Sequence, residues 1–129
     1  MHIRQIKENC LYVKNLKRTL DFYHRKLGLI LMSHVEGRHI FFRAGSSVLL
    51  CFLPEVTRAE TKLPPHYAYG PQHLAFEVEA KEYDLWKKRL QDSSIKIVHE
   101  QYWKEERYSV YFNDPDGHLL EIVPTGVWE

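Results

Sequence analysis

The spacing of apolar residues along the chain alternates between that of strands and that of helices. The same order of strand-like and helical segments occurs twice. In the first half, a strand-like run at Glu8–Val13 precedes a segment whose apolar residues recur at helical spacing: Leu16, Leu20, Tyr23 and Leu27. Asn15 suits the cap of this helix, and Gly28 suits the position that ends it. Three further strand-like runs follow, at Leu29–Val35, His39–Arg43 and Val48–Leu53. The first half therefore predicts the order β-α-β-β-β.

The second half repeats this order. A strand at His73–Val78 leads to a helix from about Lys81 to Leu90, with Trp86 and Leu90 on one face. Further strands are predicted at Ile95–Glu100, Tyr108–Asn113 and Leu119–Val123. The run Asp114-Pro115-Asp116-Gly117 predicts a tight turn between the last two strands. We therefore expect an α+β fold in which two βαβββ modules form paired, curved mixed sheets around a central cleft.

The two modules are expected to form a single domain, residues 1–129, with module one at about 5–54 and module two at about 72–124. Residues 55–71 are predicted to link them, because Pro64, Pro65 and Pro71 oppose any regular element there. Such a long connection in a small domain favours a functional role or a span between two subunits.

Composition narrows the classes of function. With 129 residues, 44% of them hydrophobic, the chain has the size of one globular domain. Its formal net charge of +1 provides no field that would attract nucleic acid or an anionic membrane. No apolar run approaches roughly 18 residues, and the charged start lacks the apolar stretch of a signal peptide. Two cysteines do not make a disulfide scaffold, so we expect a cytoplasmic protein.

Four positions carry the candidate chemistry. Glu8 and His73 begin equivalent strands, and the endings Leu49–Pro54 and Leu119–Pro124 match Cys51 with Glu121. If the halves pack about a pseudo-two-fold axis, the four positions converge, and three of them have metal-ligand side chains. A carboxylate flanked by apolar residues, as Glu121 is, costs several kcal/mol to bury alone, and a divalent cation removes that cost.

Each residue also has an ordinary structural interpretation. Taken singly, His73 is more typical of a hydrogen-bonded structural histidine, Glu8 of a solvated strand start, and Glu121 of a salt-bridged interior acid. Cys10 and Cys51 are most simply small buried hydrophobes. The joint placement of Glu8, His73 and Glu121 at equivalent positions favours the metal site.

Three segments resemble the signatures of the vicinal oxygen chelate superfamily, which includes glyoxalase I, extradiol dioxygenases, fosfomycin-resistance thiol transferases and bleomycin-binding proteins. They are Glu8–Val13 with its continuation to Leu29, Gly70–Phe76, and Tyr111–Glu121 with its Asp-Pro-Asp-Gly turn. The resemblance spans essentially the whole chain. It implies paired modules around one divalent metal ion, which chelates adjacent oxygens of a substrate and stabilises negative charge on oxygen.

The resemblance places the metal ligands at Glu8, His73 and Glu121. The first ligand of the family is usually histidine, and a fourth position that is often a carboxylate is Cys51 here. The set favours Mn²⁺, Zn²⁺, Ni²⁺ or Mg²⁺ and argues against an extradiol dioxygenase, whose ferrous site uses two histidines. Because Cys51 is not a carboxylate, the chain lacks the general base of glyoxalase I at this position, which weakens that assignment. Ser109 and Tyr111 match the thiol transferases, but their distal arginine has no counterpart.

Two functional classes remain open. The first is a metal-dependent enzyme acting on a small molecule with vicinal oxygens, by lyase, isomerase or thiol-transfer chemistry. The second is a metal-free protein that binds an antibiotic-like ligand, as in bleomycin resistance. The retained ligand set favours the enzyme.

The expected cavity follows from strand alternation and from the resemblance. Tyr111 is predicted to be catalytic, its hydroxyl donating a hydrogen bond to a developing oxyanion. The residues expected to bind substrate are Tyr12, Phe41, Arg43, Leu49 and Arg107. The resemblance also implies a homodimer in which Glu8 comes from one subunit and His73 and Glu121 from the other.

Overall fold

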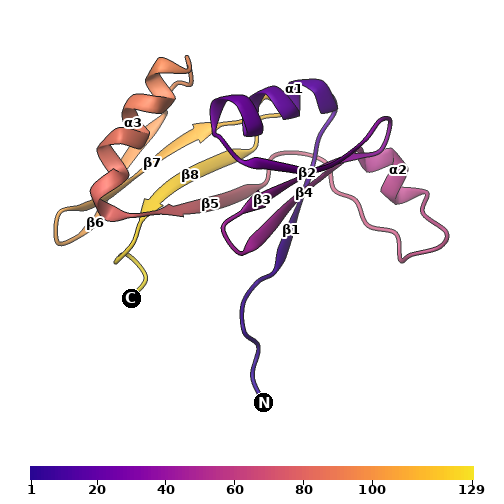
Figure 1. Ribbon diagram of the computed structural model, residues 1–129, viewed down its shortest axis with the longest axis horizontal. Coiled ribbons are helices and arrows are strands. Elements are labelled where there is room, and N and C mark those ends of the chain that lie inside the picture. Colours follow the sequence, from indigo (N-terminus) through magenta and orange to yellow (C-terminus); the bar gives the residue numbers. More distant parts are fainter. The chain divides into compact units, whose positions relative to one another are not determined.

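The computed structural model describes residues 1–129, which form two compact units, Met1–Tyr69 (unit 1) and Gly70–Glu129 (unit 2). Each unit contains one four-stranded sheet with both parallel and antiparallel pairs. The predicted α+β class with two βαβββ modules is confirmed (Figure 1). No helix is long and apolar enough to cross a membrane.

Unit 1 has the sheet order β1-β4-β3-β2, in which β1 runs parallel to β4 and the other pairs are antiparallel. Its strands are β1 (Glu8–Tyr12), β2 (Ile30–Val35), β3 (His39–Ala44) and β4 (Ser47–Phe52). Its helices are α1 (Leu16–Leu20), the π-helical turn η1 (Asp21–Lys26) and α2 (Pro54–Arg58). The helix predicted between the first two strands is therefore present, and its second half, η1, is π-helical rather than α-helical.

Both ends of that helix are set by the predicted residues. The Asn15 side chain accepts a hydrogen bond from the Arg18 N–H at 2.9 Å, which satisfies one donor of the first turn. Gly28 has a φ of +82°, and its N–H donates to the His24 carbonyl at 3.0 Å. A residue without a Cβ adopts this left-handed conformation without strain, so the chain leaves the helix there and enters β2.

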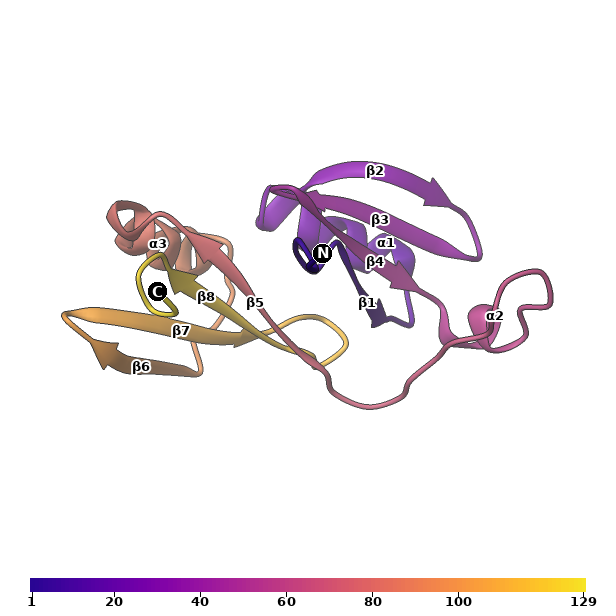
Figure 2. The ribbon, with the colours of Figure 1, turned by 90° about the horizontal axis from the view of Figure 1, so that it is seen from below.

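Unit 2 repeats the topology with the sheet order β5-β8-β7-β6. Its strands are β5 (His73–Val78), β6 (His99–Lys104), β7 (Arg107–Asn113) and β8 (Leu119–Pro124). A short 3₁₀ turn, η2 (Ala80–Glu82), precedes α3 (Tyr83–Asp92). Figure 2 shows the four strands of each sheet side by side.

The turn between β7 and β8 forms at the predicted residues. One carboxylate oxygen of Asp114, Oδ1, accepts hydrogen bonds from the N–H groups of Asp116 and His118, both at 2.9 Å. The Gly117 N–H donates to the Asp114 carbonyl at 3.1 Å. The Asp114 side chain therefore stabilises the turn by accepting hydrogen bonds from its backbone.

Two sequence predictions are wrong. The strand predicted at Ile95–Glu100 begins only at His99, because Ile95 instead caps the end of α3, its N–H donating to the Leu90 carbonyl at 2.9 Å. The linker was expected to lack regular structure, yet α2 occupies Pro54–Arg58. Proline at the first helical position lacks only an N–H that would have no partner there.

One face of each sheet packs against the helix of its own unit, as Figure 1 shows for α1 and α3. In unit 1 the packed face includes Leu11, Ile40, Phe42, Leu49 and Cys51, all buried. In unit 2 it includes Val110, Phe112, Leu120 and Ile122, also buried. Alternation along the strands places the candidate ligands on the opposite face of each sheet, called here the helix-free face.

Candidate metal and substrate site

Two predicted metal ligands meet on the helix-free face of unit 2. His73 begins β5, and Glu121 lies in β8, which is hydrogen-bonded to β5. The His73 Nε2 is 3.5 Å from the Glu121 Oε2. The Glu121 side chain is 9% exposed and that of His73 is 49% exposed. A buried carboxylate thus faces a more accessible imidazole nitrogen.

The orientation of the His73 ring is fixed by its other nitrogen. Nδ1 lies 2.8 Å from the Leu119 carbonyl oxygen, which can only accept a hydrogen bond, so Nδ1 is the protonated nitrogen. In the neutral form of the ring, Nε2 carries a lone pair, and this nitrogen lies on the side of Glu121. Metal-ligating histidines are commonly held in this way, with the second nitrogen donating to a carbonyl.

Tyr111 lies beside this pair. It is the cross-strand partner of Glu121, and its ring stacks near that of His73, with 6.1 Å between the ring centres and 23° between the planes. Ser109 shares this face as well, two residues before Tyr111 in β7. Burial, together with the charge of Glu121, raises the pKa of Tyr111, so the hydroxyl keeps its proton at neutral pH and remains a donor.

Glu8 belongs to unit 1, where it begins β1 on the helix-free face together with Cys10 and Tyr12. Glu8 is exposed, whereas Cys10 is half-buried. Burial, reinforced by the negative charge of Glu8, raises the pKa of Cys10, so this thiol is protonated at neutral pH. No group of three or more His, Cys, Asp or Glu side chains is gathered at one point. Glu8 as the third ligand therefore stays a prediction.

The predicted match of Cys51 with Glu121 is wrong. Glu8 pairs with Val48 in β4 and His73 with Leu119 in β8, so two residues further along, the counterpart of Glu121 is Leu50. Cys51 is fully buried on the helix-packed face. Matching the two strand endings by residue type alone places them one residue out of register, and a shift of one residue moves every side chain to the other face.

Leu49 is also misplaced by the prediction. It pairs with Asn9 and Phe42, on the face that packs against the helix, and is 3% exposed. It therefore belongs to the core of unit 1 and is removed from the substrate site. Tyr12, Phe41 and Arg43 do share the helix-free face, since their partners in β4 are Phe52, Leu50 and Val48.

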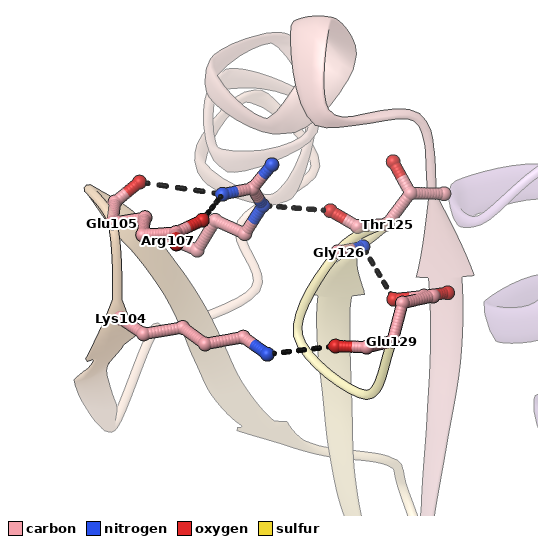
Figure 3. A network of polar contacts seen from close by, with 6 residues as sticks. All are labelled: Lys104, Glu105, Arg107, Thr125, Gly126 and Glu129. Carbon is pink, nitrogen blue, oxygen red and sulfur yellow. Dashed lines mark hydrogen bonds and ion pairs between the residues drawn. The ribbon is translucent and has the colours of Figure 1, made fainter.

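Arg107, expected to bind substrate, is engaged by the C-terminal turn instead (Figure 3). Its Nε donates to the Thr125 carbonyl at 3.1 Å, and its Nη1 lies 3.1 Å from the Glu105 carboxylate. A Cβ added to Gly126 would stand 2.2 Å from the Arg107 Nε, so only glycine allows the guanidinium this approach. Nε and Nη1 are thus engaged, which gives Arg107 a structural role, while its contact with substrate stays a prediction.

Comparison with known families agrees with this architecture. The model of the Glyoxalase/Bleomycin resistance protein/Dioxygenase superfamily matches residues 2–122. The chain belongs to this superfamily. The resemblance drawn from the sequence motifs is thereby confirmed.

Relatives within the superfamily include antibiotic-resistance transferases. Metallothiol transferase FosB of Bacillus licheniformis is 33% identical over 118 residues, 91% of this chain and 73% of the relative. Glutathione transferase FosA of Serratia marcescens is 28% identical, over 93% of this chain and 80% of the relative. Among solved structures, lactoylglutathione lyase from Agrobacterium tumefaciens is similar, with a TM-score of 0.92, 31% identity and 98% coverage of both chains.

This superfamily member also contains site-forming residues that the sequence did not reveal. In unit 1, a hydrogen bond of 2.6 Å joins the His66 Nδ1 and the Tyr12 hydroxyl. The His66 ring packs edge-on to Phe52. In unit 2, the Trp103 indole N–H donates to the Ser109 hydroxyl at 2.9 Å. His66 stands in an irregular segment and Trp103 at a β-bulge, so neither has a periodic pattern that would assign its side chain to a face.

Proposed function

We propose that this protein is a divalent-metal-dependent enzyme that acts on a small molecule with two adjacent oxygen atoms, by lyase, isomerase or thiol-transfer chemistry. The observation that carries the proposal is the pair formed by His73 and Glu121. Its imidazole is fixed with Nε2 available, and its carboxylate is buried 3.5 Å away. A cation between the two would compensate a charge that is otherwise costly to bury. The residues present therefore fit a divalent metal ion.

Three residues would hold the ion: His73, Glu121 and, from unit 1, Glu8. Glu8 is included because it holds the position in β1 that His73 holds in β5. One imidazole and two carboxylates suit Mn²⁺, Zn²⁺, Ni²⁺ or Mg²⁺. A bound cation of this kind supplies positive charge that stabilises negative charge developing on oxygen.

The chain's own residues supply the remaining functions. The Tyr111 hydroxyl keeps its proton at neutral pH and is the catalytic donor in this proposal. Arg43, which shares the helix-free face with Glu8 through Val48, and Arg107 would contact an anionic part of the substrate. Tyr12 and Phe41 would contact the apolar part of the substrate.

The relatives support this class of chemistry. Two of them are named as transferases that use a thiol or glutathione, and the similar solved structure is named as a lyase of lactoylglutathione. A homodimer, with Glu8 supplied by one subunit and His73 and Glu121 by the other, is part of the proposal. A mass of twice 15.4 kDa in light scattering is the expected result for the metal-bound protein.

A metal-free binding protein is the second candidate, favoured by an aromatic cluster in unit 1. The His39 and Phe41 rings stack with centres 3.9 Å apart, and Phe41 packs edge-on to Phe52 at 5.3 Å. With Tyr12 and His66 nearby, such rings suit a planar, antibiotic-like ligand.

Metal analysis of untagged protein purified without chelator tests the proposal. We expect one equivalent of a divalent metal in the parent and none in His73→Ala. The matched control is His99→Ala, which removes another imidazole beside Tyr111, one whose Nε2 is hydrogen-bonded to Gln101 at 2.9 Å. Stoichiometric metal in His73→Ala would overturn the site. A metal-free parent that binds planar aromatic ligands would favour the second candidate.

A further inference from the structure

His73 lies at the open end of a strand pair. It is the first residue of β5, and the register of β5 with β8 begins at its pair with Leu119. The Leu119 N–H donates to the Gln72 carbonyl at 2.8 Å, and the Leu119 carbonyl accepts from the His73 Nδ1, also at 2.8 Å. Because the ends of a strand pair open more readily than its middle, a ligand placed here needs its backbone held from outside the pair.

The side chain of His118 supplies that hold. The Gln72 N–H donates to the His118 Nδ1 at 3.0 Å, and the direction of this bond is fixed because a backbone N–H can only donate. His118 is 2% exposed, so the bond is shielded from competing water. The backbone of His118 is itself held by Asp114, whose Oδ1 accepts from the His118 N–H at 2.9 Å. The peptide that joins Pro71 to Gln72 is thereby bound to the turn before β8.

Unit 1 holds the corresponding peptide by its other end. By strand register, the residue of unit 1 that corresponds to His118 is Ser47. The Ser47 hydroxyl donates to the Ile6 carbonyl at 3.1 Å, within the peptide that joins Ile6 to Lys7. This peptide stands one residue ahead of Glu8, as its counterpart in unit 2 stands one residue ahead of that unit's ligand. A donor in one unit and an acceptor in the other therefore bind the same peptide of the repeated plan.

We infer that Ser47 and His118 are positioning residues, which hold the backbone ahead of Glu8 and His73 so that each ligand has a fixed place. The inference deepens the proposed function and rests on it, because it gives two residues that would not touch the ion an effect on its binding. Their unequal burial predicts unequal effects. The bond of the buried His118 has no competition from water, whereas Ser47 is partly exposed.

Zinc affinity tests the role of His118. Apo protein is titrated with Zn²⁺ against a chromophoric chelator. His118→Leu removes the acceptor at a similar side-chain volume and should weaken binding about tenfold. His118→Asn keeps an acceptor oxygen as many bonds from the backbone as Nδ1, so it should restore the affinity of the parent. The matched control is His24→Leu, which removes another imidazole bonded to the backbone, at 2.7 Å from the Leu29 carbonyl oxygen, and should bind zinc like the parent.

Ser47→Ala tests the counterpart in unit 1. Because Ser47 is partly exposed, this variant should unfold in urea like the parent, and it keeps the inference testable even where His118→Leu does not fold. Zinc binding should weaken about threefold, and Ser47→Thr, which keeps the hydroxyl, should bind like the parent. The matched control is Ser46→Ala, which removes a neighbouring hydroxyl that donates to the Gln5 side chain at 3.4 Å. Equal zinc affinity in the two alanine variants would overturn the inference for unit 1.

A measurement on the apo protein separates this inference from the proposed function. Ring ¹⁵N chemical shifts report which nitrogen of His73 carries the proton. We expect Nδ1 in the parent and in His118→Asn, and a mixture of both nitrogens in His118→Leu. The inference would be overturned by a parent-like His73 ring in His118→Leu, or by equal zinc affinity in His118→Leu and His24→Leu. The expected change of the ring in a protein whose parent binds no zinc would mean that the proposed function fails while the positioning of His73 stands.

Discussion

The two units share one backbone plan but present different chemistry on the helix-free face. The strand pairing sets Leu50 of unit 1 against Glu121 of unit 2, and their cross-strand partners, Phe41 and Tyr111, correspond in the same way. Two residues before these partners, His39 corresponds to Ser109. Where unit 2 has a carboxylate and two hydroxyls, unit 1 has an aliphatic chain and two stacked rings.

The difference shows that this fold does not require a carboxylate at the position of Glu121. Unit 1 has Leu50 there, an aliphatic side chain that is cheap to bury, so the buried carboxylate of unit 2 is not needed to form the sheet. The Glu121 carboxylate costs stability in unit 2 and has no counterpart in unit 1. Its presence is therefore explained by its chemistry rather than by a role in folding. In the proposed metal site, the one ligand from unit 1 would be Glu8, at the exposed start of its first strand.

Glu121→Leu makes unit 2 resemble unit 1 and should have the largest effect. We expect complete loss of stoichiometric metal, because the buried ligand is removed. The free energy of unfolding of the apo protein should rise by about 1 kcal/mol, since an apolar chain replaces a buried charge. Metal analysis and urea unfolding measure the two quantities. A variant that keeps its metal would show that the carboxylate is not a ligand.

Tyr111→Phe replaces the tyrosine by the residue found at the matching position, Phe41. Removing one donor to a developing oxyanion costs about 3 kcal/mol in the transition state, so kcat should fall roughly a hundredfold once turnover is found. Because Tyr111 stands directly opposite Glu121 in the sheet, we also expect weaker binding of Zn²⁺, by about tenfold. Phe41→Leu, the control in unit 1, should leave zinc affinity unchanged. Equal kcat in Tyr111→Phe and the parent would make Tyr111 a packing residue.

The smallest expected effect is an opposite response of the two units to pH. In unit 1, burial lowers the pKa of His39, so the native state binds fewer protons than the unfolded state below about pH 6.5. In unit 2, burial, together with the charge of Glu100, raises the pKa of Tyr83, so the native state retains a proton that the unfolded state loses above about pH 10. Stability should therefore decline on both sides of neutrality.

Urea unfolding at pH 5.5, 7 and 10.5 checks this response. His39→Gln should reduce the loss of stability on the acid side only, and Tyr83→Phe the loss on the alkaline side only. If both variants follow the parent at every pH, other groups control the pH dependence.

Local sequence signals predicted most of the fold. Asn15 and Gly28 fixed the ends of the first helix, and Asp114 with Gly117 fixed the last turn, because each acts through its own neighbours along the chain. The β-branched run at Ile95 was assigned to a strand on propensity, whereas the position of β6 is set by pairing with β7. That pairing is non-local, and no pattern within β6 reveals it.

The candidate site was predicted less completely for a related reason. His73 and Glu121 lie in segments that match superfamily signatures, so the sequence identifies them. Their proximity follows from the parallel pairing of β5 with β8. The assignment of Cys51 failed because two similar strand endings can be aligned in either of two registers, and only the hydrogen-bonded partners decide between them. The contact of Arg107 with the Thr125 carbonyl was not predicted, because this partner is a backbone group that the residue types do not indicate.

The turn held by Asp114 also affects the chemical lifetime of the protein. An Asp-Gly peptide, such as Asp116-Gly117, isomerises spontaneously when the glycine nitrogen attacks the aspartate side chain and the backbone is rerouted through it. Here that nitrogen donates its proton to the Asp114 carbonyl, and the Asp116 N–H is held by the Asp114 carboxylate. The attack requires both bonds to open first. Ageing at this peptide is therefore tied to opening of the turn, and a sample kept folded should accumulate isoaspartate more slowly than a short peptide of the same sequence.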